Sequence, residues 1–494
     1  MGASCRRKSA PTSNASSTNK PPGARSSCPS SSRSSRPVAE VPQAYLEDAS
    51  GLTGHASQFA APSTAGELAA ILADCRRRLM PVTFAGAGTG LVGGRIGDGG
   101  MIVSLERFQR LEIRPGHAIA GAGISLKELH TAAQASGQFY PPDPTEWTAS
   151  VGGTIATNAS GSRSFLYGST RKWIRSLTAV FIDGSIRAFR RGDRVDFPIS
   201  PLPAPLARKH TAGYPLRESM DWIDLLCGSE GTLAAVVEAE LSLLPQPAAL
   251  LSGVVFFPSP HAALSAVDSW RPIPQLRMLE YLDNSSLRIL SAAYNGIPAA
   301  AQSALLIEQQ LDALPGDPIG LWIDRLDAAN ALAEQSWFGQ TAHDRERFRA
   351  LRHSLPEVVN QRVHRNGFPK LNTDYAVPIE ASQAMLDNYV SRLEAELPGR
   401  YAIFGHIGDA HVHVNMLPES QADFDTGLPL TIEFARHAVS LGGTVSAEHG
   451  LGRKKRNLLA IEFSEPQIDA MRDVKRRLDP AWLLGRGVLF APPS

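Results

Sequence analysis

The sequence predicts a mixed α and β protein of two or three domains. With 494 residues, the chain exceeds the size at which one hydrophobic core keeps growing. Amphipathic helical patterns alternate along it with short apolar runs, which is typical of architectures that combine helices with sheets. Hydrophobic residues make up 43% and charged residues 20% of the chain, which excludes the fibrous and wholly disordered classes.

Charge and cysteine content narrow the class of partner and the compartment. A formal net charge of +1 provides no broad positive field, which argues against nucleic acid and favours a small-molecule partner. The four cysteines form no Cys-x-x-Cys pair and no cluster for zinc or an iron–sulfur centre, which fits a reducing compartment. They are Cys5, Cys28, Cys75 and Cys227. No run reaches the roughly 18 uninterrupted apolar residues that cross a bilayer, so we expect no transmembrane segment.

Residues 1–39 predict a disordered basic tail, because they are rich in Ser, Pro and Arg and contain no acidic residue. An organelle transit peptide has a similar bias, but scattered prolines break the amphipathic helix that such peptides form. A transit peptide and a basic anchor stay as alternatives. We expect a cytoplasmic protein, with a mitochondrial location or a peripheral place at the inner membrane face as alternatives.

The first folded segment is expected to begin with an amphipathic helix. Thr64 and Glu67 have the spacing of a capping box, and an apolar stripe follows them. The stripe consists of Leu68, Ile71, Leu72, Cys75 and Leu79. A second capping box, at Ser125 and Glu128, opens another helix. Between the two helices, the runs PVTFAG, MIVSL and AIAGAG predict strands.

Three later features mark the organisation of the chain. Asp183-Gly184 separates two β-rich runs and predicts an antiparallel hairpin. The proline-punctuated stretch 190–219 lacks periodicity and predicts a long surface loop. After Pro247, the run LLSGVVFF restarts the pattern, which places a domain boundary near residue 250.

Three glycine-rich segments indicate contact with a ligand. Residues 85–94 (AGAGTGLVGG) follow a strand-like run, and their amides can form a nest for a pyrophosphate without obstruction by Cβ atoms. This loop matches neither the P-loop nor the dinucleotide fingerprint, so taken alone it could be a structural turn. Similar glycine-rich segments follow at residues 141–162 and 228–241.

A histidine-rich run, residues 401–418 (YAIFGHIGDAHVHVNMLP), is a second candidate site. Side chains two residues apart in a strand share a face, so His411, His413 and Asn415 are expected on one face. Imidazoles beside a carboxylate bind divalent metals, and the glycine-flanked pair Glu448-His449 supplies the carboxylate. Taken singly, each histidine is more simply a surface or hydrogen-bonded residue, and the Glu-His pair could cap a helix.

Two basic side chains that precede this cluster could hold a substrate carboxylate. Arg352 can bind a carboxylate through two hydrogen bonds, and Lys370 adds a point charge. The alternative for Arg352 is a solvated basic helix face, because four further arginines crowd its neighbourhood.

These motifs, in this order over residues 40–490, resemble FAD-linked oxidases of the vanillyl-alcohol oxidase type, in the branch of D-lactate, glycolate and D-2-hydroxyglutarate dehydrogenases. The resemblance implies an α+β fold with a FAD-binding domain of two subdomains over residues 40–250. It implies an α/β substrate domain, the C-terminal domain of FAD-linked oxidases, over residues 251–440. Residues 441–494 would return to the flavin, although residues 485–488 depart from the usual Asn-Pro-Gly-Lys ending.

The resemblance also implies that the glycine-rich segments bind FAD, with the pyrophosphate at the first of them. The implied FAD-binding residues are Gly86, Ala87, Gly88, Thr89, Gly90, Leu91, Gly94, Pro142, Asp143, Ser150, Gly152, Gly153, Thr157, Asn158, Gly161, Gly231, Val236 and Val237. Some relatives tether FAD through a histidine that matches Gly88, so non-covalent binding is expected here. Ala85 stands where relatives usually have arginine.

By the same resemblance, the histidine cluster is a metal and catalytic site. The implied ligands of a divalent metal (Zn, Mn or Fe) are His406, His413 and Glu448. The implied catalytic residues are His449, as general base, with Arg352, Lys370 and Asn415. The chain departs from the family motif at Ala410 and His411, where relatives usually have Gly-Asn. The extra imidazole could add a ligand, change the choice of metal or contact the substrate.

The expected function is oxidation of a small D-2-hydroxy acid, such as lactate, glycolate or 2-hydroxyglutarate, to the 2-oxo acid. The hydride would pass to flavin N5, while a metal lowers the pKa of the hydroxyl and His449 accepts its proton. The electron acceptor would be a quinone, a cytochrome or an electron-transfer flavoprotein, and the chain could form a homodimer. Alternatives are a flavoenzyme of the same fold with another substrate or non-redox chemistry, a non-catalytic flavoprotein, and a hydrolytic zinc enzyme.

Overall fold

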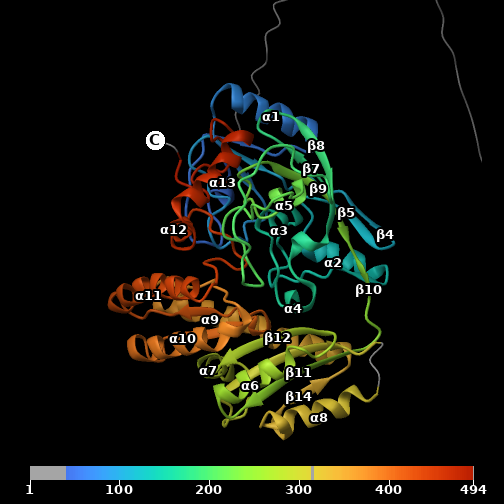
Figure 1. Cartoon of the computed structure of the whole chain (residues 1–494), viewed down its shortest axis with the longest axis vertical. Helices are drawn as coiled ribbons and strands as arrows, with labels where there is room; N and C mark the ends of the chain where they lie inside the picture. Colours follow the sequence, from blue (N-terminus) through green and yellow to red (C-terminus); the bar gives the residue numbers. More distant parts are fainter. Residues whose placement is uncertain (1–39, 313–315, 493–494) are drawn as a thin grey trace, which may run out of the picture. The chain divides into compact units, whose positions relative to one another are not determined.

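The computed structural model describes residues 40–312 and 316–492, so the predicted tail, with Cys5 and Cys28, lies outside the described residues. Helices and strands alternate through the described part, which confirms the mixed α and β prediction (Figure 1). None of the helices in this part combines the length and the hydropathy needed to cross a membrane.

The first part of the chain contains a small parallel sheet covered by one helix. Its strands, in sheet order, are β1 (Gln58–Ala60), β3 (Met101–Ser104) and β2 (Val82–Ala85). Helix α1 (Ala65–Arg77) buries Leu68, Leu72 and Cys75 in a core shared with these strands. The predicted stripe is wrong at Leu79, because the helix ends two residues earlier and Leu79 is 69% exposed in a left-handed backbone conformation.

The two predicted capping boxes differ in their outcome. At α2 (Leu126–Ala135) the box is complete, since the side chains of Ser125 and Glu128 each bond to the backbone of the other residue. At α1 only half of it forms: Thr64 accepts from the amide of Glu67, but the Glu67 carboxylate binds Ser63 instead. Thr64 still satisfies an amide that the first helical turn leaves unpaired, and Glu67 satisfies the amide of Ser63 just before the helix.

A five-stranded antiparallel sheet completes this half of the chain. In sheet order, its strands are β4 (Leu111–Arg114), β5 (His117–Gly121), β9 (Ala235–Ser242), β7 (Ile174–Val180) and β8 (Ile186–Arg190). The hairpin predicted at Asp183-Gly184 joins β7 to β8, and Gly184 has φ +84°, a left-handed conformation that glycine adopts without steric cost. Short helices lie between these strands: α3 (Val151–Thr157), α4 (Ser164–Tyr167) and α5 (Trp222–Leu226). Strand β6 (Gln138–Phe139) pairs with β10 (Leu244–Pro245).

The second half contains a seven-stranded sheet in which all neighbouring strands are antiparallel. The strand order is β14 (Trp337–Gly339), β11 (Leu250–Phe257), β13 (Ser303–Gln310), β12 (Leu276–Asp283), β16 (Tyr401–Gly405), β17 (His413–Met416) and β15 (Leu371–Asn372). Alternate residues of β11 enter two different cores, Val254 and Phe256 in one and Val255 and Phe257 in the other. Burial of both faces explains why LLSGVVFF is a continuous apolar run.

Helices pack against both faces of this sheet (Figure 1). Helices α7 (Asn284–Ser291) and α9 (Ala342–Asn366) share the core that contains Val254, and α6 (Pro260–Trp270), α8 (Pro318–Ala328), α10 (Ser382–Glu396) and α11 (Gln421–Ser440) share the core that contains Val255. After α12 (Leu459–Glu462) and α13 (Glu465–Leu478), the chain returns to the first half, where Leu484 pairs with Val82. The boundaries predicted near residues 250 and 440 stay predictions.

The stretch 190–219 is a loop, as predicted, but it is not a surface loop throughout. Its second half buries Thr211, Ala212, Tyr214 and Leu216. Lys209 in the same half is 5% exposed. Burial of this segment brings a cation into the interior, where it contacts the histidine cluster described below.

Candidate active site

One cavity of about 320 Å³ is lined by all three glycine-rich segments, a size within the usual range for small-molecule sites. Its walls come from residues 84–95, 144–161 and 226–236, so the loop after β2, the start of α3 and the turn before β9 face one space. Glu448 and His449 close the same cavity from the second half of the chain. The glycine loops and the Glu-His pair, predicted as separate features, therefore meet.

The first glycine loop presents free amide donors to this cavity. Among the described residues, the backbone N–H groups of Ala87, Gly88, Thr89 and Gly90 donate to no backbone or side-chain acceptor. Ala87 and Gly90 are exposed and Gly88 and Thr89 are half-buried, so these donors are accessible, and an anionic group such as a pyrophosphate would pair with them. A Cβ at Gly90 or Gly94 would point into open space, which is room that a ligand can use. The loop therefore fits a dinucleotide cofactor.

Most of the predicted FAD-binding residues line the cavity. Those that do are Gly86, Ala87, Gly88, Thr89, Gly90, Leu91, Gly94, Ser150, Gly152, Gly153, Thr157, Gly161, Gly231 and Val236. Pro142, Asp143, Asn158 and Val237 do not line it. Asp143 binds Trp147 and Arg163, and Asn158 caps α3 and accepts from the amide of Arg171. Val237 lies in the core beneath α1. The cofactor roles of the whole set stay predictions.

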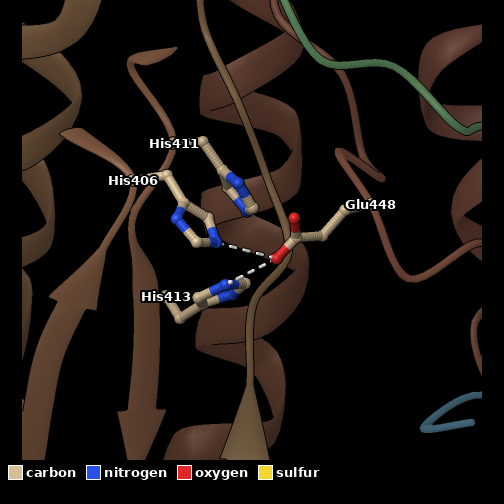
Figure 2. A group of neighbouring side chains, drawn as sticks. All are labelled: His406, His411, His413 and Glu448. Atoms are coloured by element: carbon tan, nitrogen blue, oxygen red, sulfur yellow. Dashed lines mark hydrogen bonds and ion pairs between the residues drawn. The ribbon is translucent and has the colours of Figure 1, made fainter. Parts of the chain in front are cut away.

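The histidine run and Glu448 converge on one point, as Figure 2 shows. His406 Nε2 lies 3.1 Å and His413 Nε2 lies 3.2 Å from the same oxygen, Oε1 of Glu448. One ring nitrogen of His411 joins them, and all four potential ligand atoms lie within 4.8 Å of one another. His406 directly follows β16 and His413 begins β17, and these neighbouring strands bring the two residues side by side.

Hydrogen bonds behind the rings determine which nitrogen carries the proton. His406 Nδ1 lies 2.5 Å from the Glu280 carboxylate, and His413 Nδ1 lies 3.2 Å from the carbonyl oxygen of Thr373. Both partners are acceptors, so each Nδ1 must be the N–H donor. In the neutral rings, both Nε2 lone pairs then face a carboxylate oxygen, which is repulsive unless a proton or a metal cation lies between them. This arrangement fits a divalent metal.

The other oxygen of Glu448 is fully occupied. Oε2 accepts from Ser160 Oγ at 2.6 Å, from the amide of Gly161 at 3.2 Å and from Lys209 Nζ at 3.0 Å. Gly161 has φ +87°, and a Cβ there would lie 2.0 Å from the carbonyl oxygen of Asp143, so the close approach requires glycine. Three donors on Oε2 leave Oε1 as the oxygen available to a metal.

His449 lies beside this cluster and lines the cavity. Its ring stacks on that of His413, with centroids 5.1 Å apart, and its Nδ1 is 3.5 Å from Asp374 Oδ1. The second oxygen of Asp374 accepts from the amides of Glu448 and His449 at 3.2 and 2.8 Å. Asp374, which is completely buried, thus holds the backbone of the Glu-His pair and faces the imidazole of His449.

Burial and neighbouring charges shift the pKa values of the site. Burial would raise the pKa of Glu448, but the Lys209 ammonium and the His406 ring outweigh it and hold this pKa well below its usual value. Burial lowers the pKa of His449 to about 4 and that of His411 to about 3. Burial would also lower the pKa of His406, but the Glu280 and Glu448 carboxylates outweigh burial and raise it, so a metal at this ring would have to displace a proton.

The predicted substrate arginine is held close to the cluster. Arg352 donates from Nε to Glu280 Oε2 at 2.9 Å and from a terminal nitrogen to Thr145 Oγ1 at 3.0 Å. Since Thr145 lines the cavity and Glu280 also binds His406, Arg352 belongs to the same network. A guanidinium has five N–H donors, so some stay available to a substrate carboxylate.

Two other predicted residues, Lys370 and Asn415, do not line the cavity. The Lys370 ammonium donates to Asn360 Oδ1 at 3.0 Å. Asn415 lies on β17, two residues after His413, and its Nδ2 is buried without a hydrogen bond among the described residues. The strand predicted from residue 411 begins at His413, and His411 forms only an isolated bridge with Ala376.

Sequence reasoning missed several residues around the cluster. Glu280 lies within an apolar strand, Asp374 follows a short strand, and Lys209 lies in the segment taken for a surface loop. Glu230 lines the cavity and accepts from the amides of Leu451 and Gly452; burial raises its pKa to about 7. Of these residues, only Glu280 could have been noticed in the sequence, because a charged residue inside an apolar run indicates a buried charge with a specific partner.

Comparisons with known proteins find two matching family models and several relatives that cover most of the chain. A family model described as "FAD binding domain" matches residues 56–190, and one described as "FAD linked oxidases, C-terminal domain" matches residues 246–489. The D-lactate dehydrogenase of Archaeoglobus fulgidus is 31% identical over 86% of this chain and 89% of its own length. The glycolate oxidase subunit GlcD of Bacillus subtilis is 28% identical, over 87% of this chain and 88% of its own. The D-2-hydroxyglutarate dehydrogenase of Xanthomonas citri pv. viticola is 29% identical, over 87% and 89%.

A solved structure shows the same fold. Alkyldihydroxyacetonephosphate synthase superposes with a TM-score of 0.62 at 15% identity, over 86% of this chain and 76% of that one. Together with the two family models, this similarity confirms the predicted α+β fold of the vanillyl-alcohol oxidase type.

Proposed function

Because the chain belongs to the family of FAD-linked oxidases, we propose that it is an FAD-dependent dehydrogenase that oxidises a small D-2-hydroxy acid to the 2-oxo acid. One observation carries the proposal: Glu448 and His449 line the same cavity as the loop with free amides. A metal-assisted base beside a flavin site is able to carry out this oxidation.

FAD would be held non-covalently by the walls of this cavity, with its pyrophosphate at the amides of residues 87–90. When bound, FAD supplies a hydride acceptor at N5. The position of the family's covalent tether is Gly88, whose missing side chain leaves room for the Arg95 guanidinium. Arg95 in turn donates to the carbonyl oxygen of Gly86 at 3.0 Å and so supports the loop from behind.

A divalent metal, Zn, Mn or Fe, would be held by His406, His413 and Glu448. When bound, it supplies a Lewis acid that lowers the pKa of the substrate hydroxyl. Lys209, Ser160 and Gly161 position Glu448, while Glu280 and the Thr373 carbonyl orient the two imidazoles. Outer contacts of this kind orient the ligands of metal sites.

His449 would accept the hydroxyl proton, and Arg352 would bind the substrate carboxylate. Asp374 orients His449, since its carboxylate faces Nδ1 and leaves Nε2 for the proton. Lys370 and Asn415 are proposed as further substrate contacts. The reduced flavin would pass its electrons to an external acceptor, for which a quinone, a cytochrome and an electron-transfer flavoprotein are the candidates.

Anaerobic mixing of the FAD-loaded protein with D-lactate, glycolate and D-2-hydroxyglutarate tests this function. At least one of them should bleach the flavin absorbance, and the L enantiomers of the two chiral acids serve as controls. No bleaching by any of the three would contradict the proposal.

The histidine roles are tested on the same assay. His449→Ala should keep FAD bound but lose flavin reduction, and chelator treatment should leave a yellow protein that regains activity with added metal. Flavin reduction at the wild-type rate in His449→Ala would show that this residue is not the general base. Full activity in metal-free protein would show that the reaction does not use a metal.

A further inference from the structure

We propose that His411 is a fourth ligand of the metal, so that the chain offers three imidazoles and one carboxylate. This inference rests on the metal site proposed above, and it concerns the position where this chain departs from the family motif. A ring nitrogen of His411 lies within 4.8 Å of the ligand atoms of His406, His413 and Glu448 (Figure 2). The ring centroids of His411 and His413 are 4.5 Å apart.

His411 differs from its two neighbours because nothing in the described part of the chain satisfies its ring. It is completely buried, and neither ring nitrogen makes a hydrogen bond. A buried imidazole without a partner on either nitrogen destabilises the folded state, so His411 needs a partner that the hydrogen bonds of this structure do not supply. A metal would satisfy one nitrogen by accepting its lone pair.

Asp374 can satisfy the second nitrogen. His411 Nε2 lies 3.2 Å from Asp374 Oδ1, which itself has no hydrogen bond in the described part of the chain. A neutral imidazole can donate from one nitrogen to a carboxylate and offer the other lone pair to a metal. Asp374 would then orient His411 as Glu280 orients His406, with the carboxylate on one ring nitrogen and the metal on the other.

The backbone brings His411 back over His406. Ala410 has φ +53°, a left-handed conformation that is uncommon for a residue with a side chain, and the amide of His411 donates to the carbonyl oxygen of His406 at 3.2 Å. This tight turn places the two imidazole rings 5.4 Å apart. The position of His411 at the cluster is therefore set by the turn rather than by strand alternation.

Four protein ligands restrict which metal supports the proposed chemistry. Zinc sites that catalyse reactions keep three protein ligands and one open position. With four protein ligands, a metal of coordination number six, such as Mn or Fe, keeps two positions for oxygen atoms of the hydroxy acid. The inference therefore favours Mn or Fe over Zn as the active metal.

The experiment compares metal binding, not activity, in FAD-loaded wild type, His411→Asn and His130→Asn. His130 is a matched control, because it is also buried with an unsatisfied ring nitrogen but lies outside the cluster. Titration of metal-stripped protein with Mn²⁺, followed by electron paramagnetic resonance, gives the Kd. His411→Asn should raise this Kd about tenfold or more, and His130→Asn should leave it unchanged.

X-ray absorption of the Mn²⁺-loaded wild type counts the imidazole ligands directly and does not depend on a variant that folds. Three imidazoles are expected in the wild type and two in His411→Asn. Two imidazoles in the wild type, or an unchanged Kd in His411→Asn, would overturn the role of His411 while leaving the metal site intact. Failure of the wild type to bind Mn²⁺, Fe²⁺ or Zn²⁺ would instead contradict the proposed function.

Discussion

Glu280 accepts from His406 Nδ1 at 2.5 Å through one carboxylate oxygen and from Arg352 Nε at 2.9 Å through the other. A single buried carboxylate on β12 thus joins a proposed metal ligand to the proposed substrate-binding arginine. Burial would raise the pKa of Glu280, but Arg352 and His406 outweigh burial and lower it to about 2, so the group stays ionised. The charge of Glu280 is therefore part of the site.

Replacement of Glu280 by Gln should weaken metal binding. The amide cannot accept from both His406 and Arg352 as the carboxylate does, so the orientation of the imidazole is lost and the Kd for Mn²⁺ should rise about 10–100-fold. Glu308→Gln is the control, because Glu308 is a buried carboxylate on the adjacent strand β13 that binds Arg163 instead. An unchanged Kd in Glu280→Gln would show that Glu280 does not orient His406.

Asp374→Asn should slow flavin reduction about 10²–10³-fold at saturating metal, because Asn no longer favours the proton on Nδ1 of His449. The measurement is single-turnover reduction by stopped flow, with FAD content as a check on folding. Ser446→Ala is the control, since it removes one hydrogen bond to Asp374 but leaves both carboxylate oxygens in place. An equal loss in Ser446→Ala would assign the effect to loop packing.

Gly88→Ala should weaken FAD binding about tenfold, or ~1.4 kcal/mol. Gly88 has φ +84°, and an added Cβ would lie 2.5 Å from the Arg95 guanidinium, which would have to leave the carbonyl oxygen of Gly86. Gly116→Ala is a matched control, because Gly116 also has a positive φ but faces open space outside the cavity. Equal FAD affinity in the two variants would mean that Arg95 does not support the loop.

The buried imidazole of His130 should make the protein sensitive to acid. Burial lowers its pKa to about 4, whereas the unfolded chain has a value near 6.5, so between these values the unfolded state binds the proton more tightly. The free energy of unfolding therefore keeps its full contribution from the neutral His130 above pH 6.5 and loses it as the pH falls toward 4. At pH 5 the loss relative to pH 7.5 should be about 2 kcal/mol.

His130→Phe should remove this part of the acid sensitivity, since phenylalanine keeps an aromatic ring beside Trp147 without a titratable group. The measurement is the change in Tm between pH 7.5 and pH 5 in both proteins. The Tm of the wild type should fall by more than that of the variant. Equal falls in Tm would show that His130 is already protonated or exposed.

Local sequence signals predicted much of the fold. The Ser125–Glu128 capping box, the Asp183-Gly184 turn and the apolar run of β11 each depend on a few neighbouring residues. Their patterns can therefore be recognised without a structure. Where the local pattern gave a wrong prediction, contacts with distant parts of the chain decided the structure. The apolar segment after Thr211 is buried against the rest of the protein although it forms neither helix nor strand.

By itself, the sequence determined the main elements, the glycine-rich loops and the identity of the metal-ligand candidates, because these depend on residue type and short spacing. Only the tertiary structure decided that Lys209, Glu280 and Asp374, from three distant segments, surround Glu448 and the histidines. Each of these charges acts strongly on its partner in the site only when burial removes water and holds the pair within hydrogen-bond distance. That condition is a property of the folded interior, and no pattern of neighbouring residues encodes it.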